Sequence, residues 1–388
     1  MNPVLTVLAF IVFASAMFSR AIDPIVPQIA DGLGTDAATA ALLSTAYALP
    51  FAFIQPVLGA LADMFNKTKL ILICLAIVAV ATVAGALVTS FPLMVASRVL
   101  AGIGGGGLVP IAFAVLGDLV PVKDRQVAMG RLLFAIMSGN LLGATASGFI
   151  GDLFGWRAVF TVMAVVGCVV LVLGGFSLRG VGQRGGGFSL SAMHSGYRSI
   201  FANPLAKFCF GAVFVEGALM YGVFPHLASL FHDMGETRAS IPGIVIGGFA
   251  IGGVIYSLRV GFLLRVFGES WMMRLGGLFM GLSIAFISLR APWQADVLDF
   301  VVLGLAFYML HGVIQIYASE LSPPARGSAM ALHSFFYFLG QAAGPAVYSL
   351  GFHNVGVTPT LIVSGVILVA NGAVAAHFLR RPAQQSAT

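Results

Sequence analysis

The sequence predicts an all-helical integral membrane protein, in which twelve transmembrane helices form two pseudo-symmetric six-helix bundles around a central cavity. Its 388 residues are 59% hydrophobic and 9% charged, whereas a soluble domain carries about 25% charged residues. Apolar stretches of about 20 residues, each long enough to cross ~30 Å of hydrocarbon, recur along the chain. They lack the polar–apolar alternation of barrel strands, so they are predicted to be helices. A repeat, described below, relates the two halves.

The apolar stretches place the spans in order. We expect them at 4–23, 38–61, 69–89, 92–116, 127–150, 156–178, 204–230, 238–261, 270–290, 296–318, 327–350 and 357–379. The run from Val4 lacks a preceding basic segment and a small-residue cleavage site, so we expect a retained span rather than a signal peptide. Cys74, Cys168 and Cys209 lack the paired spacing of a disulfide or metal site, and we expect them to be packing residues.

Basic residues gather in alternate loops. With the N-terminus inside, the inner loops and tails hold Lys67, Lys69, Lys123, Arg125, Arg131, Arg179, Arg184, Arg198, Lys207, Arg259, Arg265, Arg274, Arg326, Arg380 and Arg381. The outer side holds Arg20, Arg157, Arg238 and Arg290. The positive-inside rule therefore predicts that both termini are cytoplasmic, in a plasma membrane such as the bacterial inner membrane. The net charge of +6 forms no basic face, so we expect no nucleic-acid partner.

A polar interval at 179–203 divides the chain into an N-terminal bundle, 1–178, and a C-terminal bundle, 204–388. It opens with glycines and arginines typical of a flexible linker. Apolar residues at helical spacing follow, and they predict a short helix on the inner membrane surface: Leu190, Met193, Tyr197, Ile200 and Phe201.

The two halves repeat each other weakly. Several residues recur at an offset of 201: Gly139 with Gly340, Gly143 with Gly344, Arg125 with Arg326, Pro24 with Pro225, and Gly34 with Gly235. Gly59 and Gly261 match at 202. A parallel repeat of six spans predicts two bundles that rock against each other to expose a central site alternately to either side.

The loop after the second span resembles a signature of the major facilitator superfamily. Gly59, Asp63 and the basic residues Lys67 and Lys69 match the pattern, whereas Met64 and Asn66 depart from it. The acid suits the positive end of a neighbouring helix. The resemblance implies a cytoplasmic gate of Gly59, Asp63, Lys67 and, at the start of span 11, Arg326. A solvated loop with ordinary topology charges is the alternative.

Two further motifs are similar to this superfamily. Span 4 carries Arg98 followed by Gly102 and Gly104, and span 5 resembles the drug:proton antiporter signature through Gly139 and Gly143. Ala144 and Ser147 replace a proline and a glycine of that signature. Small residues at this spacing also serve plain helix packing, a role that we expect for Gly139, Gly143, Gly340, Gly344 and Pro345.

Glu216 is the acid placed deepest in a predicted span. An ionised carboxylate there is costly and a protonated one is not, so Glu216 suits a proton carrier. A structural ion pair or a cation site are the alternatives. Arg98 should face water or an acid, with snorkelling to headgroups as the alternative. Asp23 is its expected partner, with Arg20 competing for Asp23.

Polar side chains at helical spacing predict the cavity lining. Span 10 carries Tyr308, His311 and Gln315, and span 11 carries His333, Tyr337 and Gln341. Arg20, Tyr47, Gln55 and Asn140 complete the expected cavity and substrate residues, and neighbouring phenylalanines favour an aromatic or amphipathic solute. Plain packing is the alternative for each buried histidine.

These patterns predict a secondary active transporter and not an enzyme, because no metal, phosphate-binding or paired acidic motif is present. The resemblance implies proton-coupled efflux of a small organic solute, without ATP or a cofactor. A proton symporter or facilitator that imports a sugar, organic acid or amino acid is the first alternative, and a non-transporting membrane sensor the second. Protons, the solute and membrane lipid are the expected partners of a functional monomer.

Overall fold

The computed structural model describes residues 3–179 and 190–379, and these residues are helical with no strand among them. The prediction of an all-helical chain is therefore confirmed. The helices are α1 (Pro3–Arg20), η1 (Asp23–Ile25), α2 (Val26–Leu33), α3 (Ala37–Met64), α4 (Lys67–Leu87), α5 (Phe91–Leu119), α6 (Val122–Phe154), α7 (Trp156–Ser177), α8 (Leu190–Ala202), α9 (Ala206–Tyr221), α10 (Phe224–His232), α11 (Ser240–Phe286), η2 (Ile287–Leu289), α12 (Trp293–Glu320), η3 (Pro323–Ala325), α13 (Arg326–Asn354) and α14 (Val357–Phe378).

The helices follow the predicted spans with three differences. α1 continues through a 3-10 turn into α2, and α9 continues into α10, so the first and seventh spans are interrupted near their ends. α11 covers both the eighth and ninth predicted spans and is broken at Gly268, whose φ of 68° and ψ of 168° are not helical. Among the described residues, ten helical segments are long and apolar enough to cross a membrane, and α13 is not one of them.

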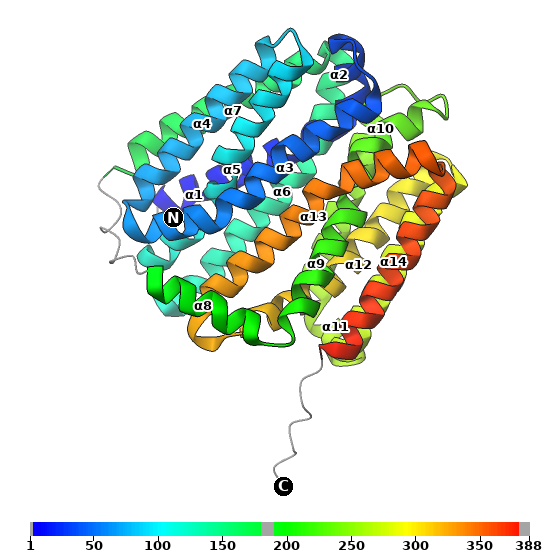
Figure 1. Ribbon diagram of the computed structural model, residues 1–388. Coiled ribbons are helices and arrows are strands. Elements are labelled where there is room, and N and C mark those ends of the chain that lie inside the picture. Colours follow the sequence, from blue (N-terminus) through cyan, green and yellow to red (C-terminus); the bar gives the residue numbers. More distant parts are fainter. Residues whose placement is uncertain (1–2, 180–189, 380–388) are drawn as a thin grey trace.

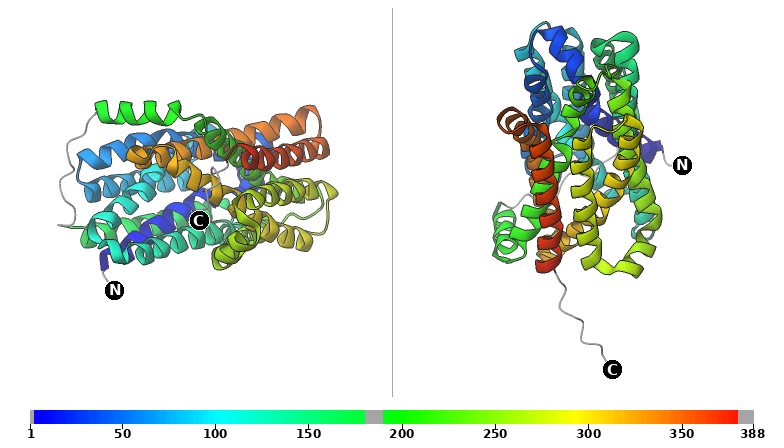
Figure 2. Two further views of the ribbon diagram at one scale, coloured as in Figure 1. Left: turned by 90° about the horizontal axis from the view of Figure 1, so that it is seen from below. Right: turned by 90° about the vertical axis from the view of Figure 1, so that its right-hand side faces the viewer.

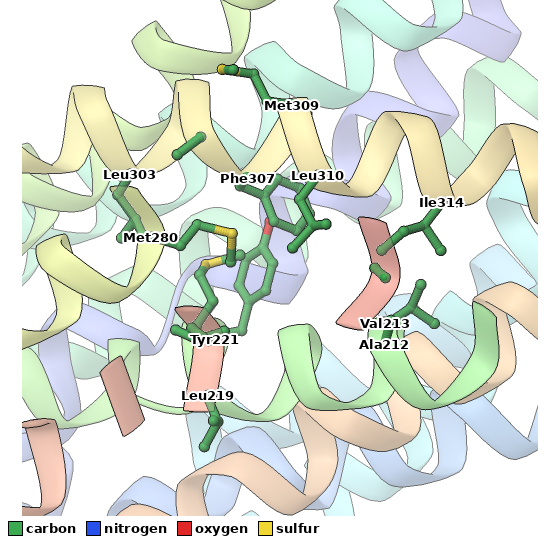
Figure 3. Packing of buried hydrophobic residues seen from close by; sticks show 14 of the residues in the cluster. Ala212, Val213, Leu219, Tyr221, Met280, Leu303, Phe307, Met309, Leu310 and Ile314 are labelled. Carbon is green, nitrogen blue, oxygen red and sulfur yellow. The ribbon is translucent and has the colours of Figure 1, made fainter. Parts of the chain in front are cut away.

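The core divides along the chain. One cluster of buried hydrophobic residues comes from residues 7–178 together with Ala239, and the other from residues 200–379 together with Ala144. Figure 1 shows the two groups of helices side by side, and Figure 2 shows α8 alongside the bundle. Figure 3 shows the second cluster, in which Tyr221 points at Phe307; their ring centroids are 5.7 Å apart.

The sequence repeat is also a repeat of contacts. A Cβ added to Gly139 in α6 would collide with the carbonyl oxygen of Phe13 in α1, and one on Gly340 in α13 would collide with that of Phe214 in α9. Both members of this contact shift by the same 201 positions. Glycine is needed at both places because the backbones of two helices approach closely there, so the expected packing role has a physical basis.

The two halves meet along two seams, α3 against α13 and α6 against α11. We call the side that holds the start of α1 and the end of α14 the terminal side. On the opposite side, the carboxylate of Asp152 in α6 accepts hydrogen bonds from the backbone N–H groups of Ala239 and Ser240, at 2.6 and 2.8 Å. Asp152 therefore caps the N-terminus of α11 from the other half of the chain.

Candidate substrate site

A cavity lies between the two halves and extends from Arg20 toward the terminal side. It has a volume of ≈ 400 Å³ and draws its lining from α1, α3, α5, α6, α9, α12 and α13. Eight of the ten residues predicted to line it do so: Arg20, Gln55, Asn140, Tyr308, His311, Gln315, Tyr337 and Gln341. These side chains come from both halves, and the lining is rich in aromatic rings.

Arg20 closes the end of the cavity that lies farther from the terminal side. Its Nη2 donates a hydrogen bond of 2.6 Å to Oε1 of Gln341, which lies on α13 in the other half. The guanidinium lies over the ring of Tyr221, 4.0 Å from the centroid. Nη1 lies 3.6 Å from Oδ2 of Asp23. Arg20 thus joins the two halves where the cavity ends.

Asp23 and Arg98 lie behind the cavity wall, and they do not form the ion pair that the sequence predicted. Asp23 is fully buried, accepts a 2.9 Å hydrogen bond from Ser44 and pairs with Arg20. Arg20 competes better because it lies one helical turn from Asp23. Arg98 instead lies over the ring of Tyr47 at 4.5 Å, and its Nε and Nη2 have no hydrogen-bond partner among the described residues.

Glu216 lies behind a histidine. Its side chain is 0% exposed, and its Oε2 is 3.3 Å from Nδ1 of His311, whose side chain is 12% exposed to the cavity. The other carboxylate oxygen, Oε1, has no hydrogen-bond partner among the described residues. The ring of His333 lies 5.0 Å from that of His311, and its Nε2 is also buried without such a partner. His311 therefore separates Glu216 from the cavity.

The family model described as Major Facilitator Superfamily matches residues 8–255 and 209–388, which together cover nearly the whole chain. The chain belongs to the major facilitator superfamily. It is therefore an integral membrane transporter and not an enzyme, as the sequence motifs predicted.

Relatives of this superfamily member include resistance proteins. Multidrug resistance protein 1 of Bacillus subtilis is 23% identical over 356 residues, 90% of each chain. Quinolone resistance protein NorA of Staphylococcus aureus is 23% identical over 383 residues, 95% of each chain. The chloramphenicol resistance protein of Streptomyces lividans is 33% identical over 141 residues, 36% of each chain. These similarities relate the chain to resistance proteins of the superfamily.

Solved transporter structures share the fold. A bacterial homologue of the human lysosomal transporter Spinster, in an inward-facing and unoccupied conformation, matches with a TM-score of 0.72 and 20% identity, covering 97% of this chain and 95% of that one. A D-xylose-proton symporter matches with a TM-score of 0.73 and 17% identity, covering 97% and 96%. At this identity the similarity establishes the fold alone.

Two predicted lining residues of the transporter do not reach the cavity. His333 is 1% exposed because His311 covers it, and Tyr47 is buried beneath the guanidinium of Arg98. Conversely, Tyr221 lines the cavity and was not predicted. The repeat offers a signal for it, because Tyr221 lies 201 positions after Arg20, the residue that it contacts.

The predicted gate residues lie at the terminal side. Lys67 forms an ion pair of 2.7 Å with Asp118 at the end of α5, within the same half. Arg326 is exposed at the start of α13. Gly59 and Asp63 belong to α3, in a part of that helix whose surroundings lie outside the described part of the structure. Nearby, Arg125 donates hydrogen bonds to the carbonyl oxygens of Gly117 and Val120.

Proposed function

We propose that the protein is a proton-coupled exporter of small organic solutes that works by alternating access. The observation that carries the proposal is the arrangement of Glu216 and His311, in which a buried carboxylate is separated by one histidine from an open, aromatic-lined cavity. The resistance proteins among its relatives support export as the direction. The driving force would be the proton gradient, without ATP.

Twelve crossings follow if α11 crosses the membrane twice, turning at Gly268, and α13 crosses once despite its lower hydropathy. Polar residues on α13, such as the buried His333 and the cavity residue Gln341, account for that lower hydropathy. The two core clusters support two six-helix bundles, at 1–178 and 204–388, that move as units. We expect both termini in the cytoplasm, so the terminal side is the cytoplasmic side and the cavity opens inward. Reporter fusions after residues 67 and 385 should then report cytoplasm, and one near 234 the outside.

In the proton step, His311 is the group that touches the cavity and Glu216 the group that stores the proton. An ionised carboxylate at 0% exposure is unfavourable, whereas a protonated one is tolerated. Transfer through Nδ1 of His311 lets Glu216 exchange protons with whichever side the cavity faces. Rocking of the two bundles then releases the proton on the opposite side.

Purified protein in liposomes with an internal pH dye tests this mechanism. Wild-type protein should move protons when challenged with members of a varied solute panel. Glu216→Gln, which mimics the protonated state, should abolish solute-driven proton flux while solute exchange without a gradient continues. Glu236→Gln, an acid in the loop after α10, is the matched control and should behave as wild type. Concentration of solute against a gradient by Glu216→Gln would rule out Glu216 as the coupling site.

Asp63 is proposed to close the terminal side in the other state of the transporter. Asp63→Asn should then increase the population that is open at the terminal side and reduce transport at unchanged expression. Wild-type turnover by this variant would leave Asp63 with a topological role only.

A further inference from the structure

We propose that the cavity selects aromatic solutes that carry a carboxylate or another anionic group, and that Arg20 is the residue that binds this group. The inference rests on the proposed exporter function and names its substrate class. It depends on the charge of the cavity lining and on the partners of Arg20.

The cavity lining is positive. Among the described residues that line it, Arg20 and His311 carry the ionisable nitrogen groups, and no aspartate or glutamate is present. Glu216, the nearest acid to His311, is 0% exposed and covered by that histidine. A cationic solute in this cavity would therefore meet an arginine and no carboxylate, which is unfavourable in a low-dielectric site.

Asp23 does not cancel this positive charge. The cavity residue Arg20 and the buried Asp23 and Arg98 behind the wall comprise two arginines and one acid, so together they keep an excess of one positive charge. Asp23 uses Oδ1 for Ser44 and faces Nη1 of Arg20 with Oδ2. The second terminal nitrogen of Arg20, Nη2, points away to the cavity residue Gln341.

Gln341 occupies the place that an anion would take. Its Oε1 is a neutral amide acceptor 2.6 Å from Nη2 of Arg20. A carboxylate is a stronger acceptor for a guanidinium than an amide is, because it adds the attraction of a full negative charge and can accept two parallel N–H groups. An anionic solute can therefore displace the amide. Since Arg20 and Gln341 belong to different halves, this exchange also breaks a bond that holds the halves together.

Aromatic rings surround this position. Tyr221 lies beneath the guanidinium at 4.0 Å, and Phe307, Tyr308, Tyr337 and Phe338 also line the cavity. Rings of this kind stack against an aromatic solute in offset or edge-to-face geometry. The site thus combines one cationic anchor with aromatic walls.

Three naphthalene compounds that differ in charge test the proposal: 2-naphthoate, 2-naphthamide and 2-naphthylmethylammonium. Binding to purified protein in nanodiscs is measured by calorimetry. We expect naphthoate to bind at least about 10-fold more tightly than the ammonium compound, as one charged hydrogen bond allows. Arg20→Gln should weaken naphthoate binding about 10-fold and leave naphthamide within about 2-fold. Arg20→Lys, which keeps the charge, should retain the preference for the anion.

Two further variants separate the anchor from general effects. Gln341→Ala should bind naphthoate at least as tightly as wild type, because no amide has to be displaced. Arg238→Gln, which removes an exposed arginine paired with Glu236, should leave all three affinities unchanged. Equal or tighter binding of the ammonium compound, an unchanged preference in Arg20→Gln, or binding of none of the three would each overturn the proposal.

The outcomes also separate this inference from the exporter function. Proton flux that depends on Glu216 but is driven only by cationic solutes would retain the exporter and overturn the anion selectivity. Binding of naphthoate that depends on Arg20, without any proton movement, would support the selectivity and contradict proton-coupled export.

Discussion

In the first half of the chain, Asp23, Arg98 and Tyr47 form a buried polar group, whereas the second half has phenylalanines at the matching positions. The repeat aligns Asp23 with Phe224 at an offset of 201, and Arg98 with Phe300 and Tyr47 with Phe249 at 202. Phe224 contacts the other two phenylalanines, with its ring 5.6 Å from that of Phe300 and 5.7 Å from that of Phe249. One backbone arrangement thus holds ions in one half and aromatic rings in the other.

The second half shows the converse. Glu216, His311 and His333 match Ser15, Val109 and Leu132 in the first half. Each half therefore buries one polar group where its counterpart is apolar or carries a single hydroxyl. Burying ions costs free energy that a well-packed apolar set does not. Because the fold accepts apolar residues at these positions, the polar groups are better explained by transport than by stability.

The largest effect that we expect comes from removing the acid of the first polar group while its arginines remain. Asp23→Leu removes the one acid of the group and leaves Arg20 and Arg98 without it, so it should cost about 3 kcal/mol or more of stability. Adding Arg98→Met to Asp23→Leu makes this half resemble its apolar counterpart. The double variant should recover about half of the loss, as measured by thermal unfolding of the purified protein.

Transport separates stability from function in the same variants. Both the single and the double variant should lose solute-driven transport, although the double variant is the more stable. If the double variant is no more stable than Asp23→Leu alone, the charge of Arg98 is not the cause of the lost stability. If it transports as wild type does, the polar group has no role in the mechanism.

A smaller effect concerns the seams between the halves. At the end opposite the termini, the α6–α11 seam has Asp152 bound to the N–H groups of Ala239 and Ser240. The same end of the α3–α13 seam has a long 3.4 Å contact from Ser349 to the carbonyl oxygen of Ala38, and the short 2.6 Å hydrogen bond of that seam, from Thr45 to Ala342, lies farther along it. Asp152→Ala removes a helix cap worth about 1 kcal/mol or slightly more. It should shift the population about 10-fold away from the state described here.

Spin labels at Asp31→Cys and Asp233→Cys, in a background with Cys168→Ala, measure the separation of the halves on the side opposite the termini. Asp152→Ala should lengthen this distance in a larger fraction of molecules. Ser349→Ala is the matched control at the other seam and should change the population less than about 2-fold, since its contact is weak. Equal shifts in the two variants would contradict the asymmetry of the seams.

Much of this fold was predictable because the length and hydropathy of membrane helices can be read from the sequence. The stripe of Tyr308, His311 and Gln315 also faces the cavity as helical spacing predicts. The ion-pair partner of Asp23 was harder to predict. Arg20 is near Asp23 in sequence, whereas the distance from Asp23 to Arg98 depends on how two helices pack.

His333 shows a second limit of the sequence. It shares a helical face with Tyr337, yet His311 from α12 covers it. Asp152 shows a third, since its partners lie 87 and 88 positions away and no local pattern links them. Contacts between helices therefore decide which side chains reach the cavity and which form hydrogen bonds, and the pattern along one helix does not contain this information.

The smallest effect that we expect concerns matching contacts of the two halves at the terminal side. Lys67 pairs with Asp118 in the first half, and the matching position of Lys67 at an offset of 202 is Glu269, which accepts a hydrogen bond of 2.9 Å from Tyr317. The first contact joins two partly exposed ions and the second joins a neutral hydroxyl to a carboxylate. Lys67→Ala should cost less than about 1 kcal/mol, and Tyr317→Phe about 1 kcal/mol.

Salt distinguishes the two contacts, because raising the salt concentration from 0.1 to 1 M shortens the screening length from about 10 to about 3 Å. The difference in thermal midpoint between wild type and Lys67→Ala should therefore shrink toward zero at high salt. The difference between wild type and Tyr317→Phe should persist, since a hydrogen bond from a neutral donor is screened much less. A Lys67→Ala effect that is unchanged by salt would mean that Lys67 stabilises this side by packing its alkyl chain rather than through its charge.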